Sequence, residues 1–382
     1  MAKAPEWILD TGPEEWVAVA AHCTLARNLA DLPFPARCGE EDRLAAAHRV
    51  SVAVARNLSG AARVDFGGAD ALEAQWLGER RLVTRDWLHA PTAGRALFAP
   101  ARGDLSIQTN GGDHVTLRAM EAGGGLSRAW ERASGADDAL GAQLNYAYDE
   151  RLGHLTARLG MVGTGLRAGL LLHLPALALR DEVGARAEAL RAQRLILNGV
   201  ATGDPADRLR DEETPEPGLW SGAVIEPLSR QCLLTDVEGA VCRGSGRGAG
   251  GLYLLHNQET LGLTEEEIVF RTAHGARGVE EAELEARRAL ARDRSTLDDL
   301  VSRAAALARG ARLLGFDEAL SLLSVLRLGM SLGIIAGPGP ARMNGALFEM
   351  QAGHLTRGRG VPAEPRAVCA RRAALVGSLV EG

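Results

Sequence analysis

The spacing of apolar and polar positions predicts a chain that mixes helices and strands. Residues 1–85 have apolar positions at helical intervals, most clearly over 40–57, and we expect this part to be helical with loops. Three runs of β-forming residues follow, separated by glycine-containing turns, and they cover 96–100, 105–110 and 114–121. Short runs with turns at this spacing are typical of an antiparallel meander.

The middle of the chain continues this mixture. We expect a helix, a hairpin, a strongly apolar helix, another helix and a strand over 126–144, 146–156, 166–179, 184–194 and 195–201. The apolar helix is interrupted by His173 and Pro175 and is too short to cross a bilayer. No membrane association is therefore expected.

Beyond an insertion, the chain is expected to form a strand at 252–256 and then mostly helices. Thr264 and Glu267 have the spacing of a capping box, in which each side chain bonds the backbone N–H of the other residue. The most apolar helix covers 320–332 and carries more apolar side chains than a lone surface helix needs. We therefore expect it to contribute to a symmetric dimer interface.

The predicted insertion covers 204–251. Its start, 204–218, holds six acidic residues, two arginines and three prolines, and its end, 243–251, holds five glycines. Segments of this composition bury little apolar surface. We interpret the insertion as an accessory element rather than a catalytic lid, and its spaced glycines as a linker rather than a phosphate-binding loop.

Composition excludes several kinds of chemistry. The chain of 382 residues holds 43 basic residues, of which only Lys3 is a lysine. A P-loop, a Schiff-base lysine and the strand lysine of eukaryotic-type protein kinases are therefore excluded. The formal net charge of −6 does not favour nucleic-acid binding, so no nucleic-acid partner is expected.

The cysteines favour a reducing compartment. They number five and show no Cys-x-x-Cys spacing, and the N-terminus lacks the pattern of a signal peptide. We therefore expect a cytoplasmic protein without a disulfide framework. His22, Cys23 and Cys38 do not have the spacing of a standard metal site, and no metal site is predicted.

Six motifs follow one another in a fixed order. They are Leu-Ala-Arg-Asn-Leu at 25–29, Asn-Gly-Gly-Asp-His at 110–114, Gly-His-Leu-Thr at 153–156, Gly-Thr-Gly at 163–165, Asn-Gln-x-Thr-Leu-Gly at 257–262 and Leu-Leu-Ser-x-Leu-Arg-Leu-Gly at 322–329. In this order they resemble the phosphagen-kinase superfamily of ATP:guanido phosphotransferases, and specifically the bacterial protein-arginine kinases. The resemblance covers most of the chain except the insertion.

The resemblance implies an α+β fold in three parts. A small helical N-terminal domain would cover 1–85, and an α/β phosphotransferase-like domain with an antiparallel sheet flanked by helices would cover 86–270. A helical C-terminal dimerisation domain would cover 271–382. Members of the family move the γ-phosphoryl group of ATP to a guanidinium nitrogen, and Mg²⁺ bridges the phosphates. The nucleotide-binding candidates that the resemblance supplies are Arg27, Arg81, His114, Gly163, Gly165 and Arg167.

The sequence departs from the family's pattern at most positions that would touch the nucleotide or the guanidinium. The family's likely base, a glutamate, aligns with Gly112, so no catalytic residue is assigned. Four phosphate-cluster arginines and a nucleotide-contacting histidine align with His22, Thr24, Thr116, Asn198 and Arg81. Loss of a single transition-state donor typically costs ~10²–10³ in rate. We therefore expect a degenerate active site, unless Arg81, Arg118, Arg158 or Arg194 takes the place of the missing arginines.

The C-terminal part shows a comparable loss. Active protein-arginine kinases carry an Arg-Asp-x-x-Arg-Ala motif that binds phosphoarginine, and the aligned residues here are 368–373. Arg371 and Arg372 are the remnant of that site, and a solvated helix end is the alternative interpretation.

These observations predict a pseudokinase that acts by binding or regulating a partner. The partners implied are a second copy of the chain, an active paralogue, a Clp-type unfoldase or a phosphoarginine-bearing protein. The alternatives are an active guanidino kinase with a rearranged phosphate-binding site, and a protein that binds a small guanidine. ATP with Mg²⁺ is the cofactor that the resemblance implies.

Overall fold

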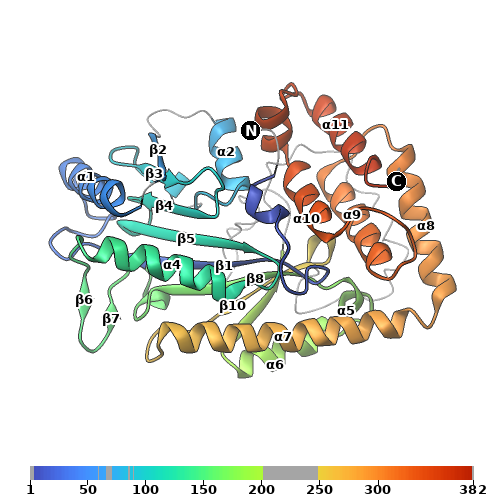
Figure 1. Cartoon of the computed structure of the whole chain (residues 1–382), viewed down its shortest axis with the longest axis horizontal. Coiled ribbons are helices and arrows are strands. Elements are labelled where there is room, and N and C mark those ends of the chain that lie inside the picture. Colours follow the sequence, from blue (N-terminus) through green and yellow to red (C-terminus); the bar gives the residue numbers. More distant parts are fainter. Residues whose placement is uncertain are drawn as a thin grey trace.

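A computed structural model describes residues 4–58, 60–65, 71–84, 87–88, 90–200 and 248–380. Its centre is an eight-stranded sheet in the order β2-β3-β4-β5-β1-β8-β10-β9, and every neighbouring pair in it is antiparallel (Figure 1). The strands are β1 (Ala18–Arg27), β2 (Ala62–Asp65), β3 (Ala96–Ala99), β4 (Leu105–Thr109), β5 (Val115–Ala122), β8 (Leu166–His173), β9 (Leu195–Gly199) and β10 (Leu252–Asn257).

Many of the expected elements are confirmed. The meander is β3, β4 and β5, and the hairpin is formed by β6 (Tyr148–Asp149) and β7 (Gly153–His154). Helix α4 (Leu126–Gly141) and helix α6 (Val183–Ala192) lie within or close to their predicted ranges. Thr264 caps α7 (Glu265–Leu290), because its hydroxyl accepts from the Glu267 N–H while the Glu267 carboxylate accepts from the Thr264 N–H.

The expectation that residues 1–85 are helical with loops is wrong for Ala62–Asp65, which forms the edge strand β2, and for Ala18–Arg27. This segment is the central strand β1, which lies between β5 and β8. All of its residues except Thr24 are buried, because other elements cover both faces of the sheet here. A strand buried on both faces lacks the alternation of apolar and polar residues that identifies a half-exposed strand.

The prediction of a helix over 166–179 is wrong for the same reason. Leu166–His173 forms β8, and only Pro175–Leu179 is helical, as α5. All residues of β8 except Arg167 are buried. Periodicity alone cannot distinguish a buried strand from a buried helix in such an apolar run.

One face of the sheet packs against helices. Apolar side chains of α1 (Glu40–Asn57), α4, α6 and α7 form a single core with inward side chains of the strands. Cys23 and Leu25 of β1 belong to this core, as do Leu117 of β5 and Leu170 of β8. Figure 1 shows α4 and α7 running across this face.

The C-terminal helices form a second core against the other face. They are α8 (Arg294–Gly310), α9 (Phe316–Ser331), α10 (Pro340–Glu349) and α11 (Pro365–Gly377). Helix α9 is buried from Ala319 to Gly329, except at Ser321, within this core. Its surplus of apolar side chains is therefore covered within the chain and no longer argues for a dimer, which remains a prediction.

The predicted domain boundaries also remain predictions. Helix α7 continues through the boundary expected between residues 270 and 271, and β1 joins the sheet of the following part. Most of the insertion predicted at 204–251 lies outside the described residues, which resume at Gly248. Within the described ranges, none of the helices has the length and apolar character that a bilayer span requires.

Candidate functional site

A row of polar side chains crosses three central strands on the sheet face away from α4. Arg118 of β5 and Arg167 of β8 are both register partners of Thr24 on β1, so the three residues lie side by side. The Arg118 Nε donates to the Thr24 hydroxyl at 3.2 Å. Two guanidinium groups therefore flank one small residue in the middle of the sheet.

The next row is formed by His22 on β1, Gly169 on β8 and His256 on β10, which are register partners. A Cβ on Gly169 would lie only 2.7 Å from the His22 Cε1 atom and 3.1 Å from the His256 Cβ atom. Real Cβ atoms essentially never make the first of these contacts. The missing side chain at Gly169 is therefore what makes room for the His22 ring.

The position of these rows follows from the cover that the C-terminal helices provide. One step further along the same face, Ala20, Met120 and Leu171 are buried in the second core. Two residues further along each strand, the same face carries His22 on β1, Arg118 on β5 and Gly169 on β8. Because alternate residues of a strand share a face, the polar site begins where the cover of the C-terminal helices ends.

A third arginine joins the group from outside the sheet. Burial lowers the pKa of His22 well below its usual value, and Arg118, Arg81, His256 and Arg167 lower it further. Arg81 follows α2 (Ala71–Glu79) and has a φ of 66°, a left-handed conformation that costs a residue with a Cβ roughly 1–2 kcal/mol. We call His22, Arg81, Arg118, Arg167 and His256 the arginine–histidine cluster.

Arg167 is oriented by its neighbours. Its Nη1 lies 3.3 Å from the Nδ1 of His256, and its Nη2 lies 3.7 Å from the sulfur of Met161. The same His256 Nδ1 lies 2.8 Å from the Asn257 carbonyl oxygen. A group of guanidinium ions with an intervening imidazole is suited chemically to binding a multiply charged oxyanion such as a polyphosphate.

The loop at 110–114 is braced by the N-terminal motif. Asp113 Oδ1 accepts from the Asn28 side chain at 2.6 Å and from the Ala157 N–H at 2.7 Å. His114 Nδ1 accepts from the Leu29 N–H at 3.2 Å, and burial lowers the pKa of His114 to about 4. His114 is thus a neutral structural acceptor. Gly112, which lies in the turn between β4 and β5, brings no carboxylate.

Arg27 is similarly engaged in the fold. It is only 2% exposed, and its Nη2 donates to Asp137 at 2.6 Å, while its Nη1 donates to the Thr164 carbonyl at 2.8 Å. Gly163 and Gly165 have φ values of 117° and 63°. A Cβ on Gly163 would lie 2.3 Å from the Thr260 carbonyl oxygen, and one on Gly165 would lie 2.6 Å from that of Ala26. These glycines allow the turn to pack closely against neighbouring backbone.

Comparison with known proteins decides the family. Residues 50–207 match the ATP:guanido phosphotransferase C-terminal catalytic domain, and residues 294–381 match the protein-arginine kinase McsB C-terminal domain. The protein-arginine kinase of Symbiobacterium thermophilum is 33% identical over 377 residues, which cover 97% of this chain and 95% of the relative. The chain belongs to the protein-arginine kinase family of ATP:guanido phosphotransferases.

Other members and more distant structures agree with this assignment. The protein-arginine kinase of Moorella thermoacetica is 30% identical over 384 residues, covering 99% of this chain and 97% of the relative. A crystal structure of lombricine kinase has a TM-score of 0.53 at 19% identity and covers 74% of this chain and 72% of that one. The duplicated taurocyamine kinase from Schistosoma mansoni has a TM-score of 0.52 at 22% identity, over 70% and 33% of the two chains. The expected α+β phosphagen-kinase fold is confirmed.

The structure separates the nucleotide-binding candidates of this family member into two groups. Arg167 and Arg81 both lower the pKa of His22 and so belong to the arginine–histidine cluster, and Arg27 and His114 hydrogen-bond to Asp137 and to the Leu29 N–H. Of the other arginines considered as replacements, Arg118 joins the cluster. Arg194 is exposed and pairs with Glu259 at 3.2 Å, and Arg158 is exposed.

Sequence reasoning missed His22 as a site residue. It treated His22 as a lost arginine and rejected it as a metal ligand, although the alternation along 18–27 could have placed His22 and Thr24 on one face. The same alternation separates His22 from Cys23, whose side chain lies in the first core. Among the described residues, no group of three or more His, Cys, Asp or Glu side chains is arranged to hold a metal ion.

The phosphoarginine remnant is divided between two environments. Arg372 is 5% exposed, and its Nε and Nη1 donate to the carbonyl oxygens of Met350 and Leu314 at 2.8 and 2.9 Å. Arg371 is exposed on the same helix. Arg372 therefore ties α11 to the neighbouring loops, and Arg371 alone of the two faces solvent.

Proposed function

We propose that this protein-arginine kinase homologue binds the polyphosphate of ATP at the arginine–histidine cluster and acts through binding, with impaired phosphoryl transfer. The observation that supports the proposal is that Arg81, Arg118 and Arg167 all act electrostatically on one histidine of the central strand. Arginine binds phosphate oxygens through parallel N–H bonds, and a hydrogen bond to a charged group contributes about 1.5–3 kcal/mol.

The cluster replaces the phosphate site that substitution had removed. Arg118 and Arg81 come from positions that the resemblance does not assign to phosphate-binding arginines, and Arg167 stays in its expected place. The positive charges of three guanidinium groups complement the negative charges of a nucleoside triphosphate. Mg²⁺ would arrive with the nucleotide, held chiefly by phosphate oxygens, and would supply further charge neutralisation.

Impaired transfer is argued from the missing base. The resemblance places the base at Gly112, which has no side chain to accept a proton. The neighbouring Asp113 is 7% exposed, and its Oδ1 already accepts two hydrogen bonds within the fold. Orientation of the guanidinium and proton acceptance each contribute to the rate, and general base catalysis alone is typically worth ~10²–10⁴.

Calorimetry tests the nucleotide-binding half of this proposal. Titration of ATP with and without Mg²⁺ should show binding to the wild-type protein, and Arg167→Ala should weaken it by about 10- to 100-fold, the loss of one charge-assisted contact. Arg191→Ala is the matched control, since Arg191 is exposed on α6 and pairs with Glu188. Equal affinities of wild type and Arg167→Ala would contradict a site at the cluster.

A phosphorylation assay tests the impaired transfer. We expect no acid-labile phosphate above background on free arginine or arginine-bearing protein incubated with ATP and the protein. Such phosphate, lost in Arg167→Ala, would instead support the second candidate, an active guanidino kinase whose phosphate site is rebuilt from Arg81 and Arg118. The same three-arginine cluster favours that alternative, so the two candidates differ only in turnover.

The partners of the chain belong to the proposal as well. A second copy, an active paralogue, a Clp-type unfoldase or a phosphoarginine-bearing protein would each fit an impaired kinase. The exposed Arg371 is the residue that we would expect a phosphoarginine to contact. Loss of phosphoarginine binding in Arg371→Ala, measured by calorimetry, would support that partner class.

A further inference from the structure

We propose that Glu79 is a positioning residue for the arginine–histidine cluster, because its buried carboxylate fixes the end of α2 on the C-terminal part of the chain and so places Arg81. The inference rests on the proposed binding of the ATP polyphosphate at the cluster. It adds that the affinity for the nucleotide depends on a residue that does not itself touch the nucleotide.

Glu79, the last residue of α2, is held at the start of the short π-helix η6 (His354–Gly358). The two elements are distant in the sequence but in contact, and Figure 1 shows α2 beside the C-terminal helices. The Glu79 Oε1 atom accepts from the Gly353 N–H at 2.8 Å, and its Oε2 atom accepts from the His354 N–H at 2.8 Å. The His354 Nδ1 atom lies 2.9 Å from the same Oε2 atom. Glu79 is 5% exposed, so this is a buried attachment of α2 to η6.

Gly353 makes room for this carboxylate. Its φ of −63° is helical and suits any residue, so the backbone conformation does not require a glycine here. A Cβ on Gly353 would lie 2.7 Å from the Glu79 Oε2 atom, and real Cβ atoms essentially never make such a contact. The missing side chain therefore allows the close approach that the two backbone hydrogen bonds need.

A second contact between α2 and η6 lies nearer the surface. The Arg357 Nη2 atom donates to the Glu73 carboxylate at 2.8 Å, and the Arg357 guanidinium lies 5.5 Å from the centre of the Trp76 ring. The Arg357 side chain is 45% exposed and that of Glu73 is 29% exposed. Because solvent screens an exposed ion pair, it contributes little to holding two elements together. The buried carboxylate of Glu79 is therefore the stronger attachment.

The backbone after Glu79 ties Arg81 to the last turn of α2. The Arg81 N–H donates to the Gly78 carbonyl at 3.0 Å and the Leu82 N–H donates to the Leu77 carbonyl at 3.1 Å, which are the two bonds of a Schellman motif. Arg81 occupies the left-handed position of this motif, where glycine is usual. A shift of the last turn therefore carries Arg81 with it. An arginine kept in a conformation that favours glycine points to a role for its side chain.

A second anchor brings Arg81 to the sheet face of the cluster. The Thr84 N–H and hydroxyl both donate to the Gln108 Oε1 atom, at 2.8 and 3.2 Å. Gln108 on β4 pairs with Thr116 on β5, two residues before Arg118, so Gln108 and Arg118 share one face of the sheet. Arg81 thus lies between an attachment to η6 and an attachment to the face that carries Arg118. Its electrostatic effect on the histidine of β1 agrees with this place.

The test is a double-mutant cycle on ATP affinity, measured by calorimetry with the full chain. Glu79→Gln keeps the size of the side chain but replaces one acceptor oxygen with a donor that faces a backbone N–H, and it should weaken ATP binding by about 3- to 30-fold. Arg81→Gly removes the guanidinium and leaves a residue suited to the left-handed position, and it should weaken binding by about 10- to 100-fold. In the double variant, Glu79→Gln should add little to the loss caused by Arg81→Gly, because its effect is exerted through Arg81.

Two further variants separate positioning from a general loss of structure. Gly353→Ala disturbs the same contact from η6 and leaves α2 unchanged, and it should weaken ATP binding in the wild-type background but not in Arg81→Gly. Glu73→Gln is the matched control, because it removes a partly exposed contact between the same two elements, and ATP affinity should stay unchanged. Chemical denaturation without ATP shows whether each variant is folded under the conditions of the titration.

Full additivity of Glu79→Gln and Arg81→Gly, or unchanged affinity in Glu79→Gln and Gly353→Ala, would overturn the inference and leave the proposed function intact. The inference would also fail if both of these variants unfold, since Glu79 would then serve stability alone, or if Arg81→Gly binds ATP normally while Arg167→Ala does not. Absence of ATP binding to the wild type, or normal binding in both Arg81→Gly and Arg167→Ala, would overturn the proposed function as well.

Discussion

Two histidines on the same face of the sheet lie among arginines, one in a structural network and the other in the proposed binding site. His173, at the end of β8, lies under the C-terminal helices near Arg287 and Arg327, and His22 lies in the arginine–histidine cluster. Burial and the neighbouring arginines lower the pKa of both well below the usual value. The difference is in the elements around them: the C-terminal helices lie over His173, whereas Arg118, Arg167 and His256 lie on the strands beside His22.

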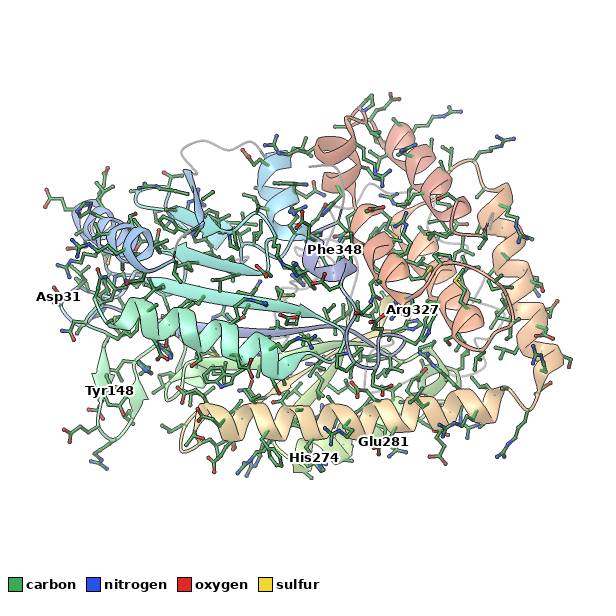
Figure 2. All side chains as sticks on the ribbon, viewed as in Figure 1. Asp31, Tyr148, His274, Glu281, Arg327 and Phe348 are labelled. Carbon is green, nitrogen blue, oxygen red and sulfur yellow. The ribbon has the colours of Figure 1, made fainter. Side chains whose placement is uncertain are left out.

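The two arginines near His173 find hydrogen-bond partners within the fold. Arg287 Nε donates to Glu283 at 2.8 Å, and both side chains are almost fully buried. Glu283 also accepts from the N–H groups of Ala176 and Leu177. Arg327 donates to Asn344 and to the carbonyl oxygens of Glu15 and Trp16, and it lies where the C-terminal helices meet the sheet (Figure 2).

The comparison shows how similar residues serve either stability or binding. Near His173, Arg287 meets a carboxylate and backbone carbonyls, Arg327 meets an amide oxygen and backbone carbonyls, and the network joins two parts of the chain. At His22 the groups that shift its pKa are all basic, which suits the proposed binding of an anion. The predictions that follow test this division.

Arg287→Ala should have the largest effect on stability. It leaves Glu283 buried without its cation, and breaking a buried ion pair in this way typically costs about 3–5 kcal/mol. The free energy of unfolding, measured by chemical denaturation, should fall by that amount. Arg191→Ala, which breaks an exposed pair on α6, should change it by less than about 0.5 kcal/mol. Similar values for the two variants would show that the His173 network is not a stabilising one.

Arg118→Ala should affect ATP affinity more than stability. We expect ATP affinity to fall by about 10- to 100-fold, because one charge-assisted contact is lost. The free energy of unfolding should change much less than in Arg287→Ala, since removing Arg118 also relieves repulsion among the basic groups. Calorimetry and denaturation on the same preparation measure both. A variant that unfolds readily and binds ATP normally would place Arg118 with the structural arginines.

Glu280 adds a pH-dependent contribution from a buried carboxyl group. Burial and, to a smaller extent, the neighbouring Glu14 raise its pKa to about 7. Since the folded state holds this proton more tightly than the unfolded state, its contribution to stability is present below about pH 4.5 and is lost as the pH rises through about 7. Glu280→Gln should therefore stabilise the protein at pH 8 by about 2 kcal/mol.

The matched control for Glu280 is the next residue. Glu281 is exposed on α7, as Figure 2 shows, and Glu281→Gln should leave the pH dependence of unfolding nearly unchanged. Denaturation at about pH 5 and about pH 8 separates the two variants. An identical pH profile for wild type and Glu280→Gln would contradict the raised pKa.

Arg372→Ala and Arg371→Ala should show the smallest contrast, within one helix. Arg372 holds two backbone carbonyls, so its loss should lower the free energy of unfolding by about 1–3 kcal/mol. The exposed Arg371 should contribute less than about 0.5 kcal/mol. Thermal melts of both variants test this, and the opposite order of stabilities would show that Arg371 is the structural residue.

The sequence predicted elements that have local signals and missed those that depend on distant partners. Glycine turns and β-forming runs identified the meander, and Thr264 with Glu267 identified the start of α7. Strands β1 and β8 were missed because both of their faces are buried, so their apolar runs carry no period. Only the tertiary cover, supplied by helices far away in sequence, distinguishes them from helices.

The sequence predicted those residues of the candidate site that belong to a motif. Arg167 follows the glycine turn of its motif and was found there. The role of His22 depends on the register of β1 against β5 and β8, and of β8 against β10, which brings Arg118 and His256 beside it. In the sequence, Arg27 and Arg372 looked like ligand-binding residues. The oxygen atoms that accept their hydrogen bonds, such as those of Asp137, belong to residues far along the chain.

The position of β1 between β5 and β8 has a consequence for synthesis of the chain. Leu25 pairs with Leu117 on one side and with Leu166 on the other. At the usual rates of translation, roughly 10–30 s pass between the appearance of Leu25 and that of Leu166. During this interval one edge of the central strand has no native neighbour, and such an edge is open to pairing with other chains. Until β8 has left the ribosome, the nascent protein is therefore exposed to misassembly at its own centre.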